Sequence, residues 1–197
     1  MRSEMHFSAR RKTMRVITGT ARGRRLITLE GTDTRPTTDR VKEALFSIIQ
    51  FEIEGRRVLD LFAGSGQLGI EALSRGAKSA VFVDSSKKSA EVVRKNLATT
   101  GFSESAAVIC GDSIAFLKSR SEKFDIAFLD PPYSTGLLQK ALAALTPVMS
   151  KSGVIICEAP DSEELPVSAG EFVLQKRYRY GKVGLAVYRA AESEEGL

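Results

Sequence analysis

The chain has 197 residues, of which 43% are hydrophobic, and a formal net charge of +5. This length supports one α/β core with a small addition and excludes two full domains. No apolar run approaches the roughly 18 residues of a membrane span, and no apolar signal segment follows the basic start, so we expect a cytoplasmic protein without a membrane partner.

Cysteine and histidine usage gives no support to a metal site. Cys110 and Cys157 lie in separate apolar runs without metal-ligand or redox spacing, and they are expected to be small buried hydrophobic residues in a reducing compartment. His6, the single histidine, lies in the basic leader.

Basic residues are concentrated at the N-terminus. Residues 1–25 contain eight arginines and lysines against one acid, a local charge of +7, whereas the other 172 residues carry −2. Such a located patch suits a polyanion. Residues 1–13 are predicted to be a disordered basic leader, since Met14 could itself be the initiator, and a short organellar transit peptide is a less favoured alternative.

Residues 14–54 form the next predicted module. Residues 15–19 and 22–27 favour a short β-hairpin, because glycines punctuate β-favouring residues. Residues 34–39 contain hydroxyl groups and an acid suited to a helix start, and apolar residues then recur at helical spacing up to residue 49. This module is predicted to be a cap in front of the main domain.

From residue 56 onward, strand and helix patterns alternate, which predicts a mostly parallel sheet with helices on both faces. Strands are expected at 58–62, 80–83, 107–110, 124–129 and 154–157, and helices at 68–75, 86–97, 114–117 and 138–145. Thr146 and Pro147 resemble a helix cap and its first residue, and residues 172–180 and 183–189 alternate as an antiparallel hairpin. The prediction is a seven-stranded Rossmann-like domain over residues 55–190, followed by a disordered tail at 191–197.

A glycine-rich loop follows the first predicted strand. Gly64, Gly66 and Gly69 fit the G-x-G-x-x-G pattern, with Asp84 twenty residues after the first, so a dinucleotide-binding fold is an alternative. However, Asp60 directly before the loop would place a carboxylate beside a pyrophosphate, whereas it suits the ammonium group of an amino-acid-like cofactor.

Acids follow three predicted strands, and this arrangement favours S-adenosylmethionine over NAD. Asp84 can accept hydrogen bonds from both ribose hydroxyls, and Asp112 can meet an adenine amino group. The candidate cofactor residues are Asp60, Phe62, Ala63, Gly64, Gly66, Asp84, Ser85, Asp112 and Ser113.

A second candidate site follows the strand predicted at 124–129. Asp130 and the carbonyl of Pro131 can accept the two N–H groups of a planar amine and aim its lone pair at a methyl donor, while Pro132 holds a rigid corner and Tyr133 stacks on an extruded base. These four residues therefore predict catalysis of nucleobase amine methylation.

The sequence resembles the RsmD family, whose members are S-adenosylmethionine-dependent guanine-N2 methyltransferases of small-subunit (16S) ribosomal RNA. The likeness is carried by residues 35–46, 59–77, 124–133 and 180–189, in the same order. It implies a class I methyltransferase fold, a guanine amine as the acceptor and ribosomal RNA within an assembled or partly assembled subunit as the partner. It also places Asp60, Gly64, Gly66, Asp84 and Asp112 at the cofactor and residues 130–133 at the target base. We expect a monomer.

The RNA footprint is predicted on the N-terminal module. Its candidate residues are Arg22, Arg24, Arg25, Arg35, Thr37 and Arg40. Three alternatives stay open: an adenine or cytosine amine methyltransferase of DNA or other RNA, a protein-glutamine methyltransferase, and a noncatalytic RNA-binding assembly module. Ser47, Gln67 and Asp84 depart from residues common in the family, and the shorter Asp84 carboxylate bears on cofactor affinity.

Overall fold

The computed structural model describes residues 14–29, 39–133 and 135–191. Its strands are β1 (Arg57–Asp60), β2 (Ser79–Asp84), β3 (Ala106–Cys110), β4 (Phe124–Leu129), β5 (Met149–Pro160), β6 (Ser168–Ala169), β7 (Phe172–Tyr180) and β8 (Val183–Ala190). They form one sheet in the order β3-β2-β1-β4-β5-β8-β7-β6. Pairing is parallel from β3 to β5 and antiparallel from β5 to β6.

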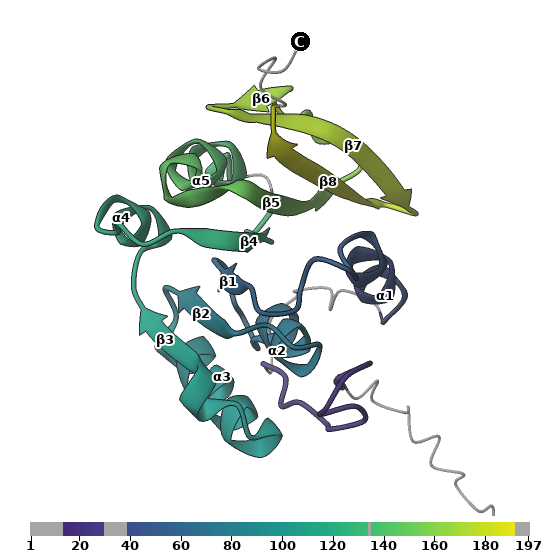
Figure 1. Ribbon diagram of the computed structural model, residues 1–197, viewed down its shortest axis with the longest axis vertical. Helices are drawn as coiled ribbons and strands as arrows, with labels where there is room; N and C mark the ends of the chain where they lie inside the picture. Colours follow the sequence, from purple (N-terminus) through teal and green to yellow (C-terminus); the bar gives the residue numbers. More distant parts are fainter. Residues whose placement is uncertain (1–13, 30–38, 134, 192–197) are drawn as a thin grey trace, which may run out of the picture.

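Helices cover both faces of this sheet (Figure 1). They are α1 (Asp39–Ile48), α2 (Gln67–Ser74), α3 (Lys87–Thr100), α4 (Ser113–Lys118) and α5 (Leu137–Leu145), and short 3₁₀ turns span Ser103–Ser105 and Thr146–Val148. Apolar side chains of α1, α2 and α3 share one buried cluster with one face of the sheet, whereas those of α4 and α5 share a second cluster with the other face. Successive side chains of the central strands point alternately to the two faces, so each strand contributes residues to both clusters, as a doubly wound fold requires.

The N-terminal segment (residues 14–29) packs on α2 and α3. Val16, Ala21 and Leu26 belong to the same buried cluster as α1 and α2. The predicted hairpin is reduced to one antiparallel bridge between Arg15 and Arg25. Further backbone hydrogen bonds cross the hairpin, among them one from the Val16 amide to the Arg24 carbonyl oxygen, whereas other amides of the segment bind side chains of α2 and α3.

Three other details differ from the expectation. Cys110 is exposed rather than buried, because it ends the edge strand β3, whereas Cys157 is buried as expected. The sheet has eight strands rather than seven, because the two-residue β6 pairs with β7 after the long connection from β5. Thr146 and Pro147 begin a 3₁₀ turn that directly continues α5, rather than capping a new helix. Within the described ranges, no helix combines the length and the apolar character that a membrane crossing needs.

Candidate active site

The sheet reverses its winding between β1 and β4, and ligands of open α/β sheets bind at the carboxyl edge of such a switch point. Asp60 ends β1, and Asp130 directly follows β4. The register pairs Asp60 with Phe128, two residues before Asp130. The fold thus brings the two predicted sites to one edge on neighbouring strands.

Asp60 is buried beneath the glycine-rich loop, with 3% of its surface exposed. Its Oδ2 accepts a hydrogen bond of 3.0 Å from the amide of Gly69 in α2. Burial raises the pKa of Asp60 to about 7, the Gly69 hydrogen bond lowers it, and the charge of Asp84 raises it further. A carboxyl group in this state gains most from a cationic partner, which would restore its charged form.

The structure explains why three positions of the loop are glycine. Gly64 and Gly66 have positive φ angles of 53° and 79°, which residues with side chains rarely adopt. A Cβ at Gly69 would lie 2.3 Å from the ring of Phe82, so this glycine allows α2 to pack closely on β2. The third glycine of the pattern therefore serves helix-to-strand packing, and the first two shape the turn.

Asp84 fixes the same loop from the end of β2. Its Oδ2 accepts from the amide of Gly64 at 2.8 Å, and its Oδ1 accepts from the amide of Ser86 at 2.8 Å. Each carboxylate oxygen has a second lone pair, so the group can still accept hydrogen bonds from a ribose. Ser85, beside it, is exposed.

Asp112, past the end of β3, is exposed and caps α4 by accepting a 2.7 Å hydrogen bond from the amide of Ala115. Asp60, Asp84 and Asp112 therefore lie at or just past the ends of three adjacent strands, as predicted. Ser113 is buried, Ala63 is buried, and Phe62 is partly buried. These three carboxylate acceptors, on β1, β2 and after β3, fit the ammonium, ribose and adenine groups of S-adenosylmethionine in that order.

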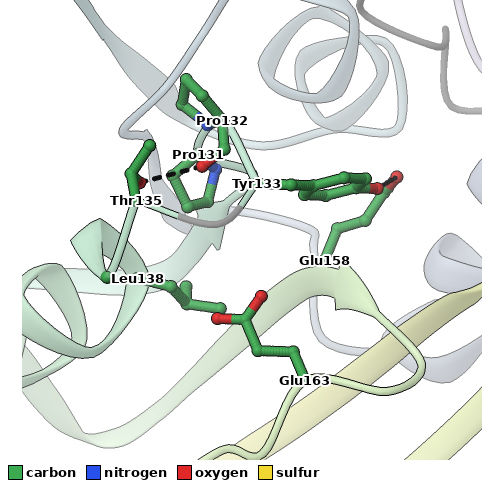
Figure 2. Close-up of a pocket in the computed structure, with 8 residues that line it drawn as sticks. Pro131, Pro132, Tyr133, Thr135, Leu138, Glu158 and Glu163 are labelled. Atoms are coloured by element: carbon green, nitrogen blue, oxygen red, sulfur yellow. Dashed lines mark hydrogen bonds between the residues drawn. The ribbon is translucent and has the colours of Figure 1, made fainter.

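The segment after β4 forms one wall of a hollow (Figure 2). Pro131 is buried, while Pro132 is exposed and 41% of the Tyr133 surface is exposed. The hollow is lined by Pro131, Pro132, Tyr133, Thr135, Gly136, Leu138, Glu158 and Glu163. An exposed aromatic ring beside a rigid corner is suited to stacking on a planar group.

Asp130 lies among other carboxyl groups. Burial raises its pKa well above the ordinary value, and the charges of Glu158 and Asp60 raise it further. A carboxyl group with a raised pKa is a stronger base once it is ionised, which suits a group that receives a proton.

Glu158 is the functional candidate that sequence reasoning missed. It lies in β5, has only 4% of its surface exposed, and its Oε1 accepts a long hydrogen bond of 3.5 Å from the Tyr133 hydroxyl. The available signal was an acid directly after the apolar run 154–157, in the same relation to its strand as Asp130.

The predicted RNA-binding arginines have mixed positions. Arg22, Arg24, Arg25 and Arg40 are exposed, whereas Arg35 and Thr37 lie outside the described residues. Of the arginines that the structure describes, none lines the hollow around Tyr133. Arg22, Arg24 and Arg25 lie instead in the N-terminal segment, which packs on α2 and α3.

Buried polar side chains hold this segment in place. Glu71 accepts hydrogen bonds of 2.8 and 2.9 Å from the amides of Ile17 and Thr18. Asn96 accepts from the amide of Ile27 at 2.7 Å and donates to the carbonyl oxygens of Ile27 and Ser65 at 3.0 and 2.8 Å. Asn96 thus joins the N-terminal segment to the glycine-rich loop.

The fold and its acid-lined edge define a Rossmann-like methyltransferase. The family model described as "Conserved hypothetical protein 95" matches residues 14–189. "Ribosomal RNA small subunit methyltransferase D" of Escherichia coli is 34% identical over 92% of each chain, and the Haemophilus influenzae protein of that name is 45% identical over 67% of this chain and 70% of its own length. The solved structure of Escherichia coli yhhF is 33% identical, covers 92% of this chain and 99% of its own, and superposes with a TM-score of 0.82. The chain belongs to the RsmD family.

Proposed function

We propose that this protein transfers a methyl group from S-adenosylmethionine to the exocyclic N2 amine of a guanine in small-subunit ribosomal RNA. The observation that carries the proposal is the placement of residues 130–133 directly after β4, the strand that pairs with β1 and its Asp60, at the switch point of the sheet. Membership of the RsmD family and the names of the curated relatives support ribosomal RNA as the substrate.

S-adenosylmethionine, when bound, supplies an electrophilic methyl group on a sulfonium sulfur. Asp60 would accept hydrogen bonds from its ammonium group, Asp84 from its ribose hydroxyls, and Asp112 from its adenine amine. These residues would hold the methyl donor at the carboxyl ends of β1, β2 and β3.

The target base enters the hollow beside Tyr133, which stacks on it. Asp130 and the carbonyl oxygen of Pro131 accept the two amine hydrogens, so the nitrogen lone pair is directed toward the methyl group. As the new C–N bond forms and the S–C bond breaks, Asp130 receives the amine proton and later releases it to water. Positioning of the amine supplies the larger part of the barrier reduction, about 7–11 kcal/mol. Proton removal by the base contributes a roughly 10²- to 10⁴-fold rate gain, which corresponds to about 3–5 kcal/mol.

The exposed arginines of the N-terminal segment neutralise phosphates of the RNA. Replacing Arg22, Arg24 and Arg25 together by alanine is expected to reduce the log–log salt slope of RNA binding by about 2 to 3, since each phosphate contact contributes about 0.7 to 0.9. Cofactor affinity is expected to stay the same, because these side chains lie outside the cofactor edge. An unchanged slope would contradict this footprint.

Methyl transfer with labelled cofactor tests the reaction. The acceptors are small ribosomal subunits, and protein-free RNA extracted from them, from a strain that lacks the enzyme. Nucleoside mass spectrometry is expected to find labelled N2-methylguanosine. Labelled methyladenosine would overturn the proposal, and the comparison of the two acceptors shows whether the assembled subunit is required.

A further inference from the structure

Asp130 and Glu158 occupy neighbouring places at the carboxyl edge of the sheet. Leu129 pairs with Cys157 in the parallel ladder of β4 and β5, so Asp130 and Glu158 come next on each strand. Neighbouring strands lie about 4.8 Å apart. The residues two positions earlier, Phe128 and Ile156, pair with each other and face the same buried cluster, so Asp130 and Glu158 emerge on that face as well.

The effect of Glu158 on Asp130 agrees with this placement, because its charge is the second-largest cause of the raised pKa of Asp130. Figure 2 shows the Tyr133 ring extending toward Glu158 across the hollow. The hydroxyl-to-carboxylate distance of 3.5 Å is at the long limit of a hydrogen bond. A stronger donor that enters the hollow can therefore compete for the Glu158 carboxylate.

The strand order places three carboxyl groups in a row: Asp60 on β1, Asp130 after β4 and Glu158 on β5. If the methyl donor lies at the first and the reacting amine at the second, the third faces the ring atom beside the amine. The C2 amine of guanine is flanked by N1, which bears a hydrogen, and by N3, which is an acceptor. With the N1 side toward Glu158, N2 and N1 present donors side by side. In adenine, cytosine and a carboxamide, the amine is flanked by an acceptor instead.

We infer that Glu158 is a specificity-determining residue, whose carboxylate accepts the N1–H of guanine while Asp130 holds the adjacent amine. The inference rests on the proposed function and extends it. A carboxylate opposite an adenine N1, cytosine N3 or glutamine carbonyl oxygen meets a lone pair, and the buried charge is left without that hydrogen bond. Sites built to hydrogen-bond a substrate N–H reject analogues that lack it by as much as about 10⁴- to 10⁵-fold.

The test uses 2-aminopurine, which keeps the amine at C2 but has an unprotonated N1. Once mass spectrometry has located the methylated nucleotide, subunits are reconstituted with RNA that carries guanosine or 2-aminopurine there. The unaltered protein is expected to methylate the guanosine substrate at least about 100-fold faster in kcat/KM. Equal rates on the two substrates would overturn the inference without any need for a variant.

Glu158→Gln then tests the contribution of the Glu158 carboxylate to the preference for guanosine, because the carboxamide of glutamine can donate to an unprotonated N1. The variant is expected to lose activity on guanosine and to narrow the guanosine-to-2-aminopurine ratio at least tenfold, with cofactor affinity and melting temperature near those of the unaltered protein. Glu164→Gln, an exposed acid on the connection after β5, serves as the control with an unchanged ratio.

A Glu158→Gln protein that keeps the original ratio would overturn the role of Glu158. If this variant does not fold, the ratio measured on the unaltered protein decides. Absence of N2-methylguanosine in the first experiment would contradict the proposed function instead, so the two failures can be told apart.

Discussion

The two halves of the candidate site differ in how their carboxyl groups are held. On the cofactor half, Asp60, Asp84 and Asp112 each accept a hydrogen bond of 3.0 Å or less from a backbone amide, which belongs to α2, to the glycine-rich loop and to α4 respectively. On the base half, burial and then the charge of Glu158 disfavour the charged form of Asp130, and the Tyr133 hydroxyl lies 3.5 Å from Glu158.

This difference indicates that the cofactor half is already organised, whereas the base half is completed by its substrate. A purine that brings N–H donors relieves the repulsion between the two carboxyl groups and favours their charged forms. In the proposed reaction, the binding energy of the base would thereby be used at the reacting amine, where it would favour the transition state.

Removal of the Asp130 carboxylate gives the sharpest separation of the two halves. Asp130→Ala is expected to lower kcat by at least about 10³-fold, because both the orientation of the amine and the acceptor of its proton are lost. Calorimetric titration is expected to show unchanged cofactor affinity. A parallel loss of cofactor affinity would mean that the halves do not act separately.

Asp60→Asn tests the cofactor half. Loss of a charged hydrogen bond to the ammonium group is expected to weaken cofactor binding about 10- to 150-fold, which equilibrium titration measures.

The same substitution is expected to raise the melting temperature at pH 8. In the folded protein the pKa of Asp60 is raised from 3.8 to about 7. The free-energy cost of ionising Asp60 in the folded state therefore builds up between these two pH values and is complete at pH 8, and the neutral amide of asparagine does not have this cost. The full rise corresponds to about 4 kcal/mol as an upper bound. A lower melting temperature for the variant at pH 8 would contradict the raised pKa.

The pH dependence of cofactor binding follows from the same group. Below pH 7 the Asp60 carboxyl holds a proton in the free protein, and the ammonium can bind well only after that proton leaves. Affinity is expected to fall about tenfold for each pH unit below 7 and to level off above it. Asp60→Asn is the control, since its binding should not depend on pH in this range.

Tyr133→Phe probes the weakest contact of the base half. The ring that stacks on the base remains, and only the long hydroxyl contact to Glu158 is lost. The expected loss in kcat/KM is about 2- to 10-fold, against a larger loss for Tyr133→Ala, which also removes about 1–3 kcal/mol of stacking. Equal losses in the two variants would show that the hydroxyl, not the ring, is what the reaction needs.

Much of this architecture follows from local patterns. Apolar runs and glycines placed β4 at its observed bounds and β1, β2 and β3 close to theirs, because each strand reads as a continuous buried run. Of the long β5 they identified only residues 154–157. The acids at the ends of β1, β2 and β3 could be grouped because parallel strands share a carboxyl edge.

What escaped prediction depends on pairing between distant residues. Glu158 becomes a neighbour of Asp130 only through the register of β4 with β5, and no local pattern specifies that register. The partners of the N-terminal backbone, Glu71 and Asn96, are 53 to 69 residues away in the chain. The predicted hairpin is therefore present only in part: some backbone amides pair across it, and others bind side chains of the helices.

The attachment of the N-terminal segment has a practical consequence for shortening the protein. A protein that starts at residue 30 would lose more than its exposed arginines, because Val16, Ala21 and Leu26 cover the cluster shared with α1 and α2. It would also leave Glu71 and Lys42, both fully buried, exposed to water beside uncovered apolar surface. Such a fragment should aggregate rather than serve as a catalytic core, so the N-terminal segment and the rest of the enzyme cannot be purified as separable parts.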